Sequence, residues 1–455
     1  MRKGIKLTPT ATKFALSPTL AANEVALARR AQGLPVLHMG FGESPFPVPP
    51  VLENALQAAA HRKDYLACAG DAKLREVAAN YYHKKIGLDT TKYDVVVAPG
   101  SKLILYALQM AIEGDLLMPV PSWVSYAPQA LMLHTQLIKV PTTLDDGGYH
   151  IDAATLRQTI RSARGKGLNP RKIILNSPNN PTGLVIPETE LKAIAEVLVE
   201  EDIFIISDEI YGMVNFSLVD TARSAEQPQQ LSAYQSISHY APENTAISTG
   251  LSKHLSLGGW RLGIGFVPKS IDGLHGLIAN IASETWSCVP SPITQAAIVA
   301  YSLSDQVEGH TANCSAIHNL MNQYLSEGIA TAGTGGDSSK GPYILCPMVQ
   351  GAFYNYPNFN HLRTGLKEKF GIETSQDLAK HLADTYGLIA LPGVAFGEEQ
   401  EQLTLRLSGC DYDGSKALAA YEAGDLLNES FVAKHAPHLV EQVFCFNDLV
   451  VATLQ

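Results

Sequence analysis

The sequence predicts an α/β protein: a large domain with a mostly parallel sheet and helices on both faces, plus a smaller α+β domain. Three observations predict this fold. Runs of valine and isoleucine, typical of strands buried on both sides, alternate with helical patterns in the middle of the chain. The chain has 455 residues, more than one compact core usually serves. Its composition, 46% hydrophobic and 17% charged, is that of an ordinary globular protein.

The strands and helices follow one another along this middle region. Residues 94–98 predict a buried strand, and the helical pattern of 102–112 follows it across a Pro-Gly pair. Residues 171–176 predict a second strand. A helical stretch at 188–199 then leads to a third strand at 203–207, where isoleucine predominates. Strands that alternate with helices in this way form a parallel sheet.

Outside this region the pattern changes. The N-terminal segment contains four closely spaced prolines, which exclude a regular helix there. A stretch rich in glycine, serine and threonine at 328–341 predicts a loop or a domain junction, and 402–407 predicts a short strand. We therefore expect a large domain at 56–324. The small domain would consist of 1–55 and 325–455, including a C-terminal extension.

Charge and cysteine usage narrow the class of protein. The formal net charge of -10 argues against a nucleic-acid partner. The six cysteines include no C-x-x-C pair, so no metal site is expected, and they indicate reduced thiols in a cytoplasmic protein. No apolar stretch follows the basic N-terminus, and no apolar run is long enough for a transmembrane helix. We expect neither secretion nor membrane insertion.

Unusual residues gather just after the predicted strands, where open parallel sheets bind their ligands. Gly100, Ser101 and Lys102 stand between a strand and a helix, where backbone N–H groups suit a phosphate. Taken alone, an ordinary turn explains these three residues better. The segment 176–183, Asn-Ser-Pro-Asn-Asn-Pro-Thr-Gly, follows the next strand. Its prolines and glycine fix an irregular backbone from which asparagine amides can face a cleft, and we favour this over a plain turn.

Asp208 directly follows the third strand, and Tyr211 lies three residues further on. A carboxylate at the end of so apolar a strand needs a cationic or hydrogen-bonding partner. A pyridinium nitrogen would serve. The alternative is that Asp208 caps the helix that follows it.

The segment from Gly250 to Gly263 is rich in glycine and leucine and contains two cations, Lys253 and Arg261. Desolvation lowers the pKa of a lysine and frees its amine to react with a carbonyl. The planar fork of an arginine fits a phosphate. The alternative is a pair of surface cations in a loop, which the neighbouring leucines and Trp260 disfavour.

Arg406 lies between two leucines in a strand pattern. If its side chain turns inward, it must find an anion. A substrate carboxylate and a structural ion pair are the two interpretations, and without the other motifs the ion pair would be preferred.

Together these residues resemble the fold-type I pyridoxal-phosphate enzymes of the class I/II aminotransferase family. The lysine segment fits the family signature from Gly250 to Gly263, and 180–183 and 208–211 fit its NPTG and D-x-x-Y elements. The motifs occur in the family's order and spacing over most of the chain. Further agreement lies at residues 40–45, Tyr65, Gly70, 121–123, Pro392, Gly393 and Arg406.

The resemblance implies catalytic roles for Lys253, Asp208 and Tyr211, and a cofactor contact for Asn180. Lys253 would hold pyridoxal phosphate as a Schiff base and move the proton between the substrate Cα and the cofactor C4′. Asp208 would keep the pyridine nitrogen protonated, which favours the carbanion that forms at Cα. Asn180 and Tyr211 would contact the cofactor O3′.

It also implies which residues hold the cofactor and the substrate. Trp123 would stack on the ring. Arg406, with Asn180 and the backbone at Gly42, would bind the substrate α-carboxylate. Tyr65 would reach the phosphate of a neighbouring subunit, which implies a homodimer with shared active sites. The phosphate in the same subunit would be bound by Gly100, Ser101, Lys102, Ser252 and Arg261.

Two features depart from the family pattern. Gly250 stands where some relatives carry a serine, so Ser248 or Ser252 would replace one hydrogen bond to the phosphate. The chain continues some fifty residues past Arg406, and 428–455 has apolar residues at helical spacing. We expect an extra helix there, packed on the small domain or on a partner subunit.

The sequence therefore predicts an aminotransferase that moves the amino group of an α-amino acid to a 2-oxo acid, by ping-pong chemistry on pyridoxal and pyridoxamine phosphate. A C–S lyase or a decarboxylase on the same scaffold is the alternative, because one fold hosts several bond cleavages. A non-catalytic cofactor-binding effector module belongs to another class. Such regulators carry a DNA-binding segment, and no helix-turn-helix precedes residue 40. The particular amino acid stays open.

Overall fold

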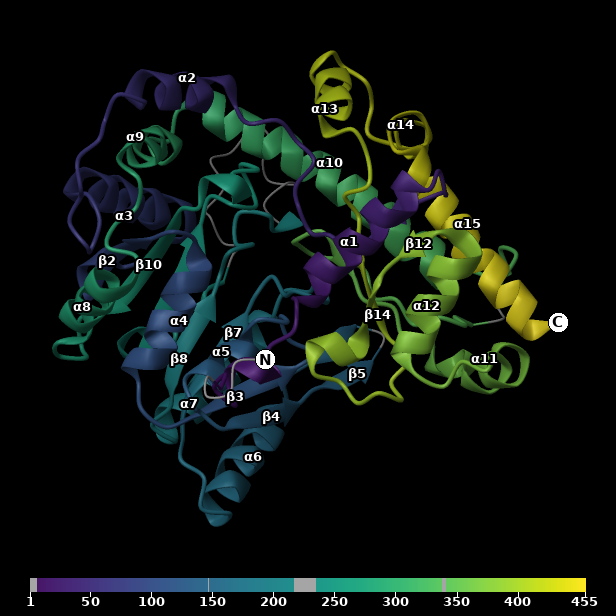
Figure 1. Ribbon diagram of the computed structural model, residues 1–455, viewed down its shortest axis with the longest axis horizontal. Helices are drawn as coiled ribbons and strands as arrows, with labels where there is room; N and C mark the ends of the chain where they lie inside the picture. Colours follow the sequence, from purple (N-terminus) through teal and green to yellow (C-terminus); the bar gives the residue numbers. More distant parts are fainter. Residues whose placement is uncertain (1–5, 146, 217–234, 338–340) are drawn as a thin grey trace.

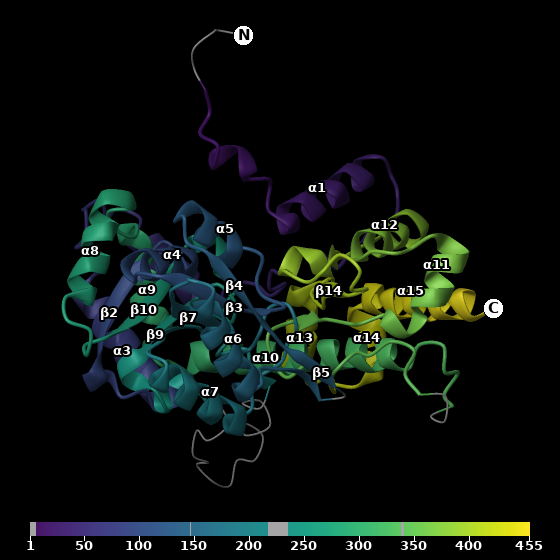
Figure 2. The same ribbon diagram turned by 90° about the horizontal axis from the view of Figure 1, so that it is seen from below.

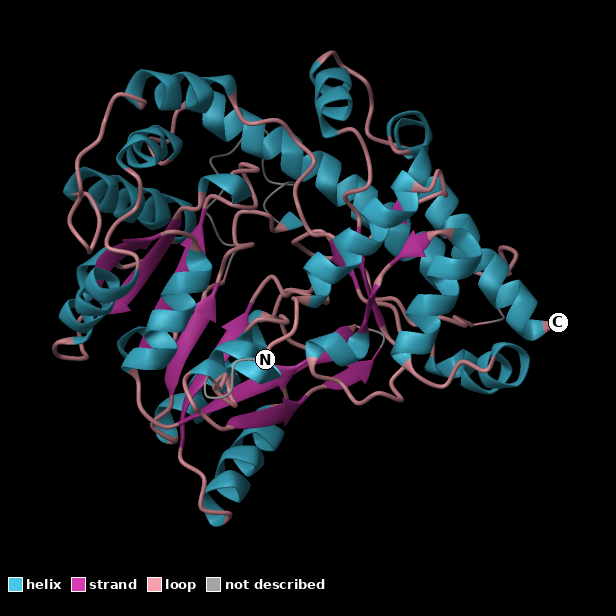
Figure 3. Ribbon diagram, in the orientation of Figure 1, coloured by secondary structure: helices cyan, strands magenta, loops and turns pink. Residues whose placement is uncertain are grey.

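The computed structural model describes residues 6–145, 147–216, 235–337 and 341–455 (Figure 1). A large twisted sheet occupies one half of the molecule, and helices with small sheets form the other half (Figure 3). Helix α10 (Asp305–Ala330) extends from the first half to the second (Figure 1). This arrangement confirms the predicted α/β fold.

The large sheet has seven strands and is parallel except for β10, which runs antiparallel to both of its neighbours. In spatial order the strands are β2 (Tyr93–Ala98), β10 (Gly263–Pro268), β9 (Thr245–Gly250), β8 (Phe204–Asp208), β7 (Pro170–Asn176), β3 (Asp115–Val120) and β4 (Leu137–Pro141). The strands predicted at 94–98 and 171–176 lie within β2 and β7, and the strand predicted at 203–207 matches β8 with a shift of one residue. Because β10 runs the other way, its first residue lies beside the last residues of β2 and β9.

Helices cover both faces of this sheet (Figure 2). Successive residues of β2 show the alternation: Val95 and Val97 belong to one hydrophobic cluster, and Val96 and Ala98 to another. One face carries α4 (Ser101–Ala111), α5 (Tyr126–Met132) and α8 (Leu274–Thr285). The other face carries α6 (Ala153–Gly165), α7 (Glu188–Glu200) and α3 (Ala72–Ile86), with α2 (Pro50–Ala59) and α9 (Ser291–Ala300) packed beside α3.

The second half has its own hydrophobic cluster, which joins the middle of α10 to the C-terminal elements. Its strands are β11 (Tyr354–Asn355), β14 (Leu405–Ser408), β13 (Leu391–Pro392), β1 (Leu37–His38) and β12 (Leu388–Ile389). Its other helices are α11 (Arg363–Phe370), α12 (Ser375–Tyr386), α13 (Gly414–Glu422), α14 (Glu429–His435) and α15 (Pro437–Leu454). A hairpin of β5 (Thr143–Asp145) and β6 (Gly148–His150) lies at the edge of the large sheet. The two-domain division at residues 56 and 324 stays a prediction.

Two sequence predictions at the C-terminal end can be compared with the structure. The stretch 328–341 was expected to be a loop, but α10 continues to Ala330. Gly328 stays helical because Val443 packs against it: a Cβ at Gly328 would lie 2.7 Å from the Val443 methyl groups. The helix expected within 428–455 is confirmed as α14 and α15, and α15 packs on α10 and α11.

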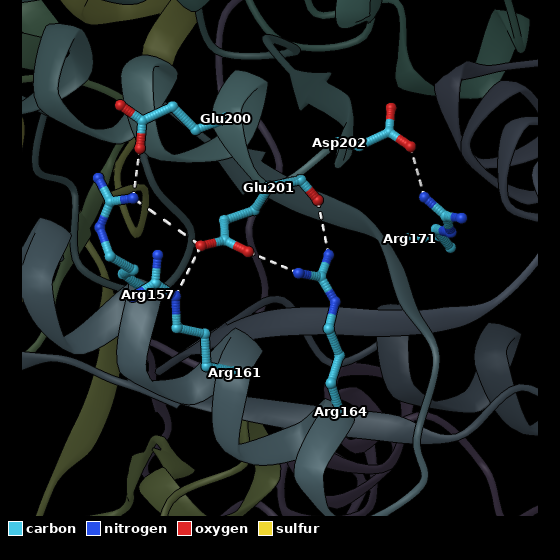
Figure 4. Close-up of polar contacts among 7 residues, drawn as sticks. All are labelled: Arg157, Arg161, Arg164, Arg171, Glu200, Glu201 and Asp202. Carbon is cyan, nitrogen blue, oxygen red and sulfur yellow. Dashed lines mark hydrogen bonds and ion pairs between the residues drawn. The ribbon is translucent and has the colours of Figure 1, made fainter.

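Helices α6 and α7 are joined by a cluster of ion pairs at the surface (Figure 4). The carboxylate of Glu201 accepts hydrogen bonds from Arg161 Nε at 2.9 Å and Arg164 Nη1 at 2.5 Å, and Arg157 lies 3.8 Å away. Burial alone would raise the pKa of Glu201, but the hydrogen bonds from Arg161 and Arg164 lower it below its usual value. The cluster joins one helix to the other, and none of its residues lines the cavity described below.

The segment before α1 (Pro18–Ala31) projects from the body of the molecule, and α1 crosses toward the second half (Figure 2). Several apolar side chains of this segment and of α1 are exposed, among them Leu16, Leu20, Val25 and Leu27. Among the described residues, no helix has the length and apolar character needed to cross a membrane.

Candidate active site

A cavity of about 410 Å³ opens at the edge of the large sheet where the parallel strands end. It brings together all of the predicted site residues except Gly100 and Tyr65. The predicted residues that line it are Gly42, Ser101, Lys102, Trp123, Asn180, Asp208, Tyr211, Ser252, Lys253, Arg261 and Arg406. The sheet explains this convergence, because most of these residues closely follow a strand or, for Arg261, precede β10.

Lys253 is half-buried in the cavity, three residues after β9. Its Nζ donates to the carbonyl of Gly42 at 2.9 Å. It also lies 5.3 Å from the ring centroid of Tyr211 and 5.5 Å from that of Phe353. The neighbouring leucines at 251, 255 and 257 are buried, so the loop is anchored and the amine faces the cavity.

Asp208 ends β8 and is 2% exposed. Its carboxylate accepts a hydrogen bond from Tyr126 Oη at 2.6 Å and one from the Ile210 N–H at 3.3 Å. Burial raises the pKa of Asp208 to about 6, although these hydrogen bonds and the charge of Lys253 lower it. Turns at residues 210–213, not a helix, directly follow Asp208, so the helix-capping interpretation is wrong. The carboxylate is a buried anion that would gain from a cation.

We expect Asp208→Asn to stabilise the cofactor-free protein at neutral pH. Because the pKa of Asp208 is raised from 3.8 to about 6, its protonated form stabilises the folded protein by about 3 kcal/mol relative to its ionised form. Because the folded pKa is the higher one, this stability is present below pH 4 and is lost as the pH rises through 6. Asparagine can still accept from Tyr126. Urea unfolding of both cofactor-free proteins should therefore show a difference that grows between about pH 4 and pH 6 and then stays constant.

Saturating cofactor provides the control for that measurement. A cation bound beside Asp208 should remove the cost of its charge, so the advantage of the asparagine variant should shrink or reverse. A pH-independent difference between the two cofactor-free proteins would contradict the raised pKa.

The segment 176–183 is held by the side chain of Asn176. Its Nδ2 donates to the carbonyl of Asp208, and its Oδ1 accepts from the Asn180 N–H, both at 2.7 Å. Asn180 is 4% exposed and its Oδ1 lies 3.4 Å from Arg406 Nη1. The predicted irregular turn is confirmed, and it points one asparagine amide toward the cavity.

Arg406 lies in β14 and is 1% exposed. Its Nη2 donates to the carbonyl of Gly40 at 2.7 Å, and its Nε has no hydrogen-bond partner. None of the ion pairs among the described residues includes Arg406, so the structural ion-pair interpretation is wrong for this part of the chain. A buried guanidinium with an unused N–H group in a cavity is suited to a carboxylate.

The opposite end of the cavity is positively charged. Gly100 has a φ of 91°, which favours glycine, and a Cβ there would lie 2.1 Å from Arg261 Nη2. Arg261 is exposed at the rim and donates to the carbonyl of Gly258 at 2.8 Å. Burial, then the charges of Arg261 and Lys253, lower the pKa of Lys102. The N-terminus of α4 adds a partial positive charge, so this end suits a dianion such as a phosphate.

Two serines were predicted as alternatives for one phosphate contact. Ser252 lines the cavity. Ser248 is fully buried in β9 and its Oγ donates to the carbonyl of Ser101. The position of the side chains therefore favours Ser252. Tyr65 lies outside the cavity and is 92% exposed.

Several residues of the site had no signal in the sequence. Tyr354 lines the cavity, and its Oη lies 2.7 Å from Tyr211 Oη. Tyr126 is the partner of Asp208, and it belongs to α5 rather than to a strand end. Ser17 and Thr19, at the start of α1, line the mouth of the cavity. Only the GAFY sequence around Tyr354, on a short strand, could have drawn attention to that region.

Comparisons with known proteins show which family and which relatives the chain resembles. The family model of class I and II aminotransferases matches residues 35–420. Aspartate aminotransferase from Geobacillus stearothermophilus is 29% identical over 404 residues, which cover 86% of this chain and 92% of the relative. Asparagine–oxo-acid transaminase from Streptococcus mutans is 28% identical over 399 residues, with the same two coverages.

Solved structures show the same fold. Aspartate aminotransferase from Thermus thermophilus with maleate superposes with a TM-score of 0.76 at 24% identity, over 97% of this chain and 100% of that one. Aspartate aminotransferase from Rhizobium meliloti gives a TM-score of 0.75 at 21% identity, over 99% and 100% of the two chains. At these identities the superpositions show the fold alone.

Proposed function

The chain belongs to the class I and II aminotransferase family, and on that premise we propose that its cavity transfers the amino group of a dicarboxylic amino acid such as aspartate. The chain is a pyridoxal-phosphate-dependent aminotransferase that acts on an amino acid and a 2-oxo acid. The transfer reaction predicted from the sequence is thereby confirmed at the level of the family. The observation that carries the proposal is one cavity that holds Lys253, the buried carboxylate of Asp208 and the buried guanidinium of Arg406. Arg406 has no anionic partner among the described residues.

The residues of the cavity fit the cofactor. Asp208, whose buried carboxylate forms no ion pair among the described residues, would meet the pyridine nitrogen. The turn at Ser101, with Ser252 and Arg261, would bind the phosphate at the positive end. Trp123 would stack on the ring, and Tyr211 with Asn180 would contact O3′. When bound, pyridoxal phosphate supplies an electron sink for the pair of electrons left at the substrate Cα.

The side chains then divide the work. Asp208 holds a proton on the pyridine nitrogen, because a carboxylate beside it favours the charged ring. Arg406 binds the substrate α-carboxylate in a bidentate contact, with Asn180 and the backbone at Gly42 beside it. That contact orients the Cα–H bond. Lys253 takes the proton from Cα and returns it to C4′, as a general base and then a general acid.

Two features support a second carboxylate on the substrate. Lys102 Nζ lies 5.0 Å from the ring centroid of Trp123 and has no ion-pair partner among the described residues. The hydroxyl side chains of Ser17 and Thr19 stand at the mouth, at the N-terminus of α1. We infer that the backbone of Lys102 stays part of the phosphate-binding turn, while its ammonium and this end of α1 bind the side-chain carboxylate. The named relatives include aspartate and asparagine transaminases, which supports the same substrate class.

We also propose a homodimer. Tyr65 is 92% exposed and does not line the cavity of its own subunit, which supports a contact with the phosphate of a partner subunit. The projecting N-terminal segment presents exposed apolar side chains, including Leu16 and Leu20, that a second copy would cover (Figure 2). Sedimentation of the purified chain should give twice the monomer mass. A monomer with full activity would contradict shared active sites.

A half-reaction screen tests the substrate proposal. Each amino acid is mixed with the cofactor-loaded enzyme, and conversion of the cofactor from its aldehyde to its amine form is followed by absorbance. Aspartate should convert at least about a hundredfold faster than alanine, measured by kcat/KM. Lys102→Met should remove most of this preference while the cofactor stays bound. Equal rates with alanine and aspartate would contradict the dicarboxylic substrate. Release of a thiol, pyruvate and ammonia from a cysteine thioether, without formation of the amine form, would indicate a C–S lyase.

A further inference from the structure

Tyr354 lines the cavity and contacts two other lining residues, Tyr211 and Arg406. It begins β11, where it pairs with Ser408 of β14, and it is 1% exposed. Because Arg406 lies two residues before Ser408 on the same strand, the register places Tyr354 and Arg406 on one face of this small sheet. The side chain of Tyr354 lines the cavity with Arg406 and Tyr211.

The hydroxyl of Tyr354 contacts Tyr211. The two Oη atoms are 2.7 Å apart, and the rings meet edge to face at 5.6 Å. Burial, then the nearby Tyr354, raise the pKa of Tyr211, so Tyr211 keeps its proton. One phenol can therefore donate to the other, and when Tyr354 is the donor the proton of Tyr211 is free for another acceptor.

The ring of Tyr354 contacts Arg406. The guanidinium carbon lies 4.6 Å from the Tyr354 ring centroid and 5.4 Å from that of Phe396. Since no carboxylate among the described residues pairs with Arg406, these two aromatic faces stabilise a desolvated cation. Aromatic faces leave the N–H edge of Arg406 available to a ligand. A protein carboxylate in their place would occupy that edge.

Gly42 closes the space around the same hydroxyl. A Cβ at Gly42 would lie 1.9 Å from Tyr354 Oη, so only glycine fits beside it. The Gly42 carbonyl accepts the hydrogen bond from Lys253 Nζ. The Tyr354 side chain is thus fixed between Gly42, Tyr211 and Arg406.

We propose that Tyr354 is a positioning residue with two separable actions: its hydroxyl orients Tyr211, and its ring orients Arg406. The inference rests on the proposed function, in which Tyr211 contacts the cofactor O3′ and Arg406 binds the substrate α-carboxylate. One residue then couples the geometry of the cofactor to that of the substrate. Neither action requires Tyr354 to touch a reacting atom.

Three variants separate the two actions. Tyr354→Phe removes the hydroxyl and keeps the ring under Arg406. Tyr354→Leu removes both. Tyr356→Phe is the matched control, because Tyr356 is equally buried, lies two residues away and loses a hydrogen bond of the same length, 2.7 Å, to Glu398 outside the cavity. If the leucine variant does not fold, Tyr354→Met fills the space without an aromatic face.

The first readout is the pH at which the absorbance of the bound cofactor changes. A donor on O3′ would withdraw electron density from the bound cofactor, so the absorbance would change at a lower pH while that donor is in place. In Tyr354→Phe, Tyr211 is less well oriented, so this midpoint should rise by about one pH unit and kcat should fall about tenfold. Tyr356→Phe should leave the midpoint in place.

The second readout is the Kd of maleate, a dicarboxylate that cannot react. It should stay within about twofold in Tyr354→Phe and rise about tenfold in Tyr354→Leu. An unchanged midpoint in Tyr354→Phe, or equal maleate affinity in the phenylalanine and leucine variants, would overturn the proposal. A wild-type protein without cofactor absorbance or without maleate binding would instead refute the proposed function, and the inference with it.

Discussion

Substitution of Lys253 by alanine is expected to lower turnover by about 10⁴-fold or more and to abolish the covalent link to the cofactor. Among the described residues that line the cavity, the only other lysine is Lys102, which lies over Trp123, so no second amine is placed to replace that of Lys253. Both the anchoring of the cofactor and the proton transfer at Cα depend on that one nitrogen. The measurement is steady-state activity together with the absorbance of the purified protein.

Borohydride reduction followed by peptide mapping gives the sharper result. The wild-type chain should carry the reduced cofactor at Lys253 and at no other lysine. Lys102→Ala is the control, because it removes a lysine of the same cavity and should keep the label at position 253. A label at Lys102 in the wild type, or a labelled peptide that survives Lys253→Ala, would contradict the assignment.

The sequence predicted the core of the site because sheet topology imposes it. In a parallel sheet the residues after each strand meet at one edge, so Asp208, Asn180 and Lys253 converge although up to 73 positions separate them in the chain. Local composition also indicated the irregular turn at 176–183 and the turn at Gly100. Each of these signals is written into a few consecutive residues next to a strand.

The contacts of Tyr354 and Tyr126 could not be predicted in the same way. Each depends on how a helix or a short strand from another region packs, and a tyrosine in an apolar segment reads as an ordinary core residue. The loop or domain junction predicted at 328–341 starts three residues too early for a related reason, because α10 continues to Ala330. Gly328 suggests a loop by its intrinsic preference, but the packing of Val443 against it keeps the helix intact.

Deletion of residues 436–455 is expected to prevent the chain from reaching a stable native state. Helix α15 places four apolar side chains in the second-half core with no exposed surface: Leu439, Phe446, Leu449 and Val450. Each contributes roughly 1.5–3 kcal/mol on burial, so their loss amounts to about 6–12 kcal/mol. That is comparable to the whole free energy of unfolding of a typical domain, about 5–15 kcal/mol. Solubility and thermal unfolding of the shortened chain would check this, and an unchanged melting temperature would refute it.

Two phenylalanines of α15 test the same argument without a truncation. Phe446 is fully buried and packs 6.0 Å from Phe359, whereas Phe444, two residues earlier, is 62% exposed. Phe446→Ala should lower the free energy of unfolding by about 3–5 kcal/mol, and Phe444→Ala by no more than about 0.5 kcal/mol. Equal effects would mean that α15 does not pack as described.

Helix α15 is also linked to the active site. Its Gln442 donates to Asp411 at 3.2 Å, and Asp411 also accepts from the His38 N–H at 2.8 Å. His38 ends the strand that leads to Gly40 and Gly42. A stable Phe446→Ala protein should therefore also bind maleate more weakly, since the Arg406 contact to Gly40 rests on that strand.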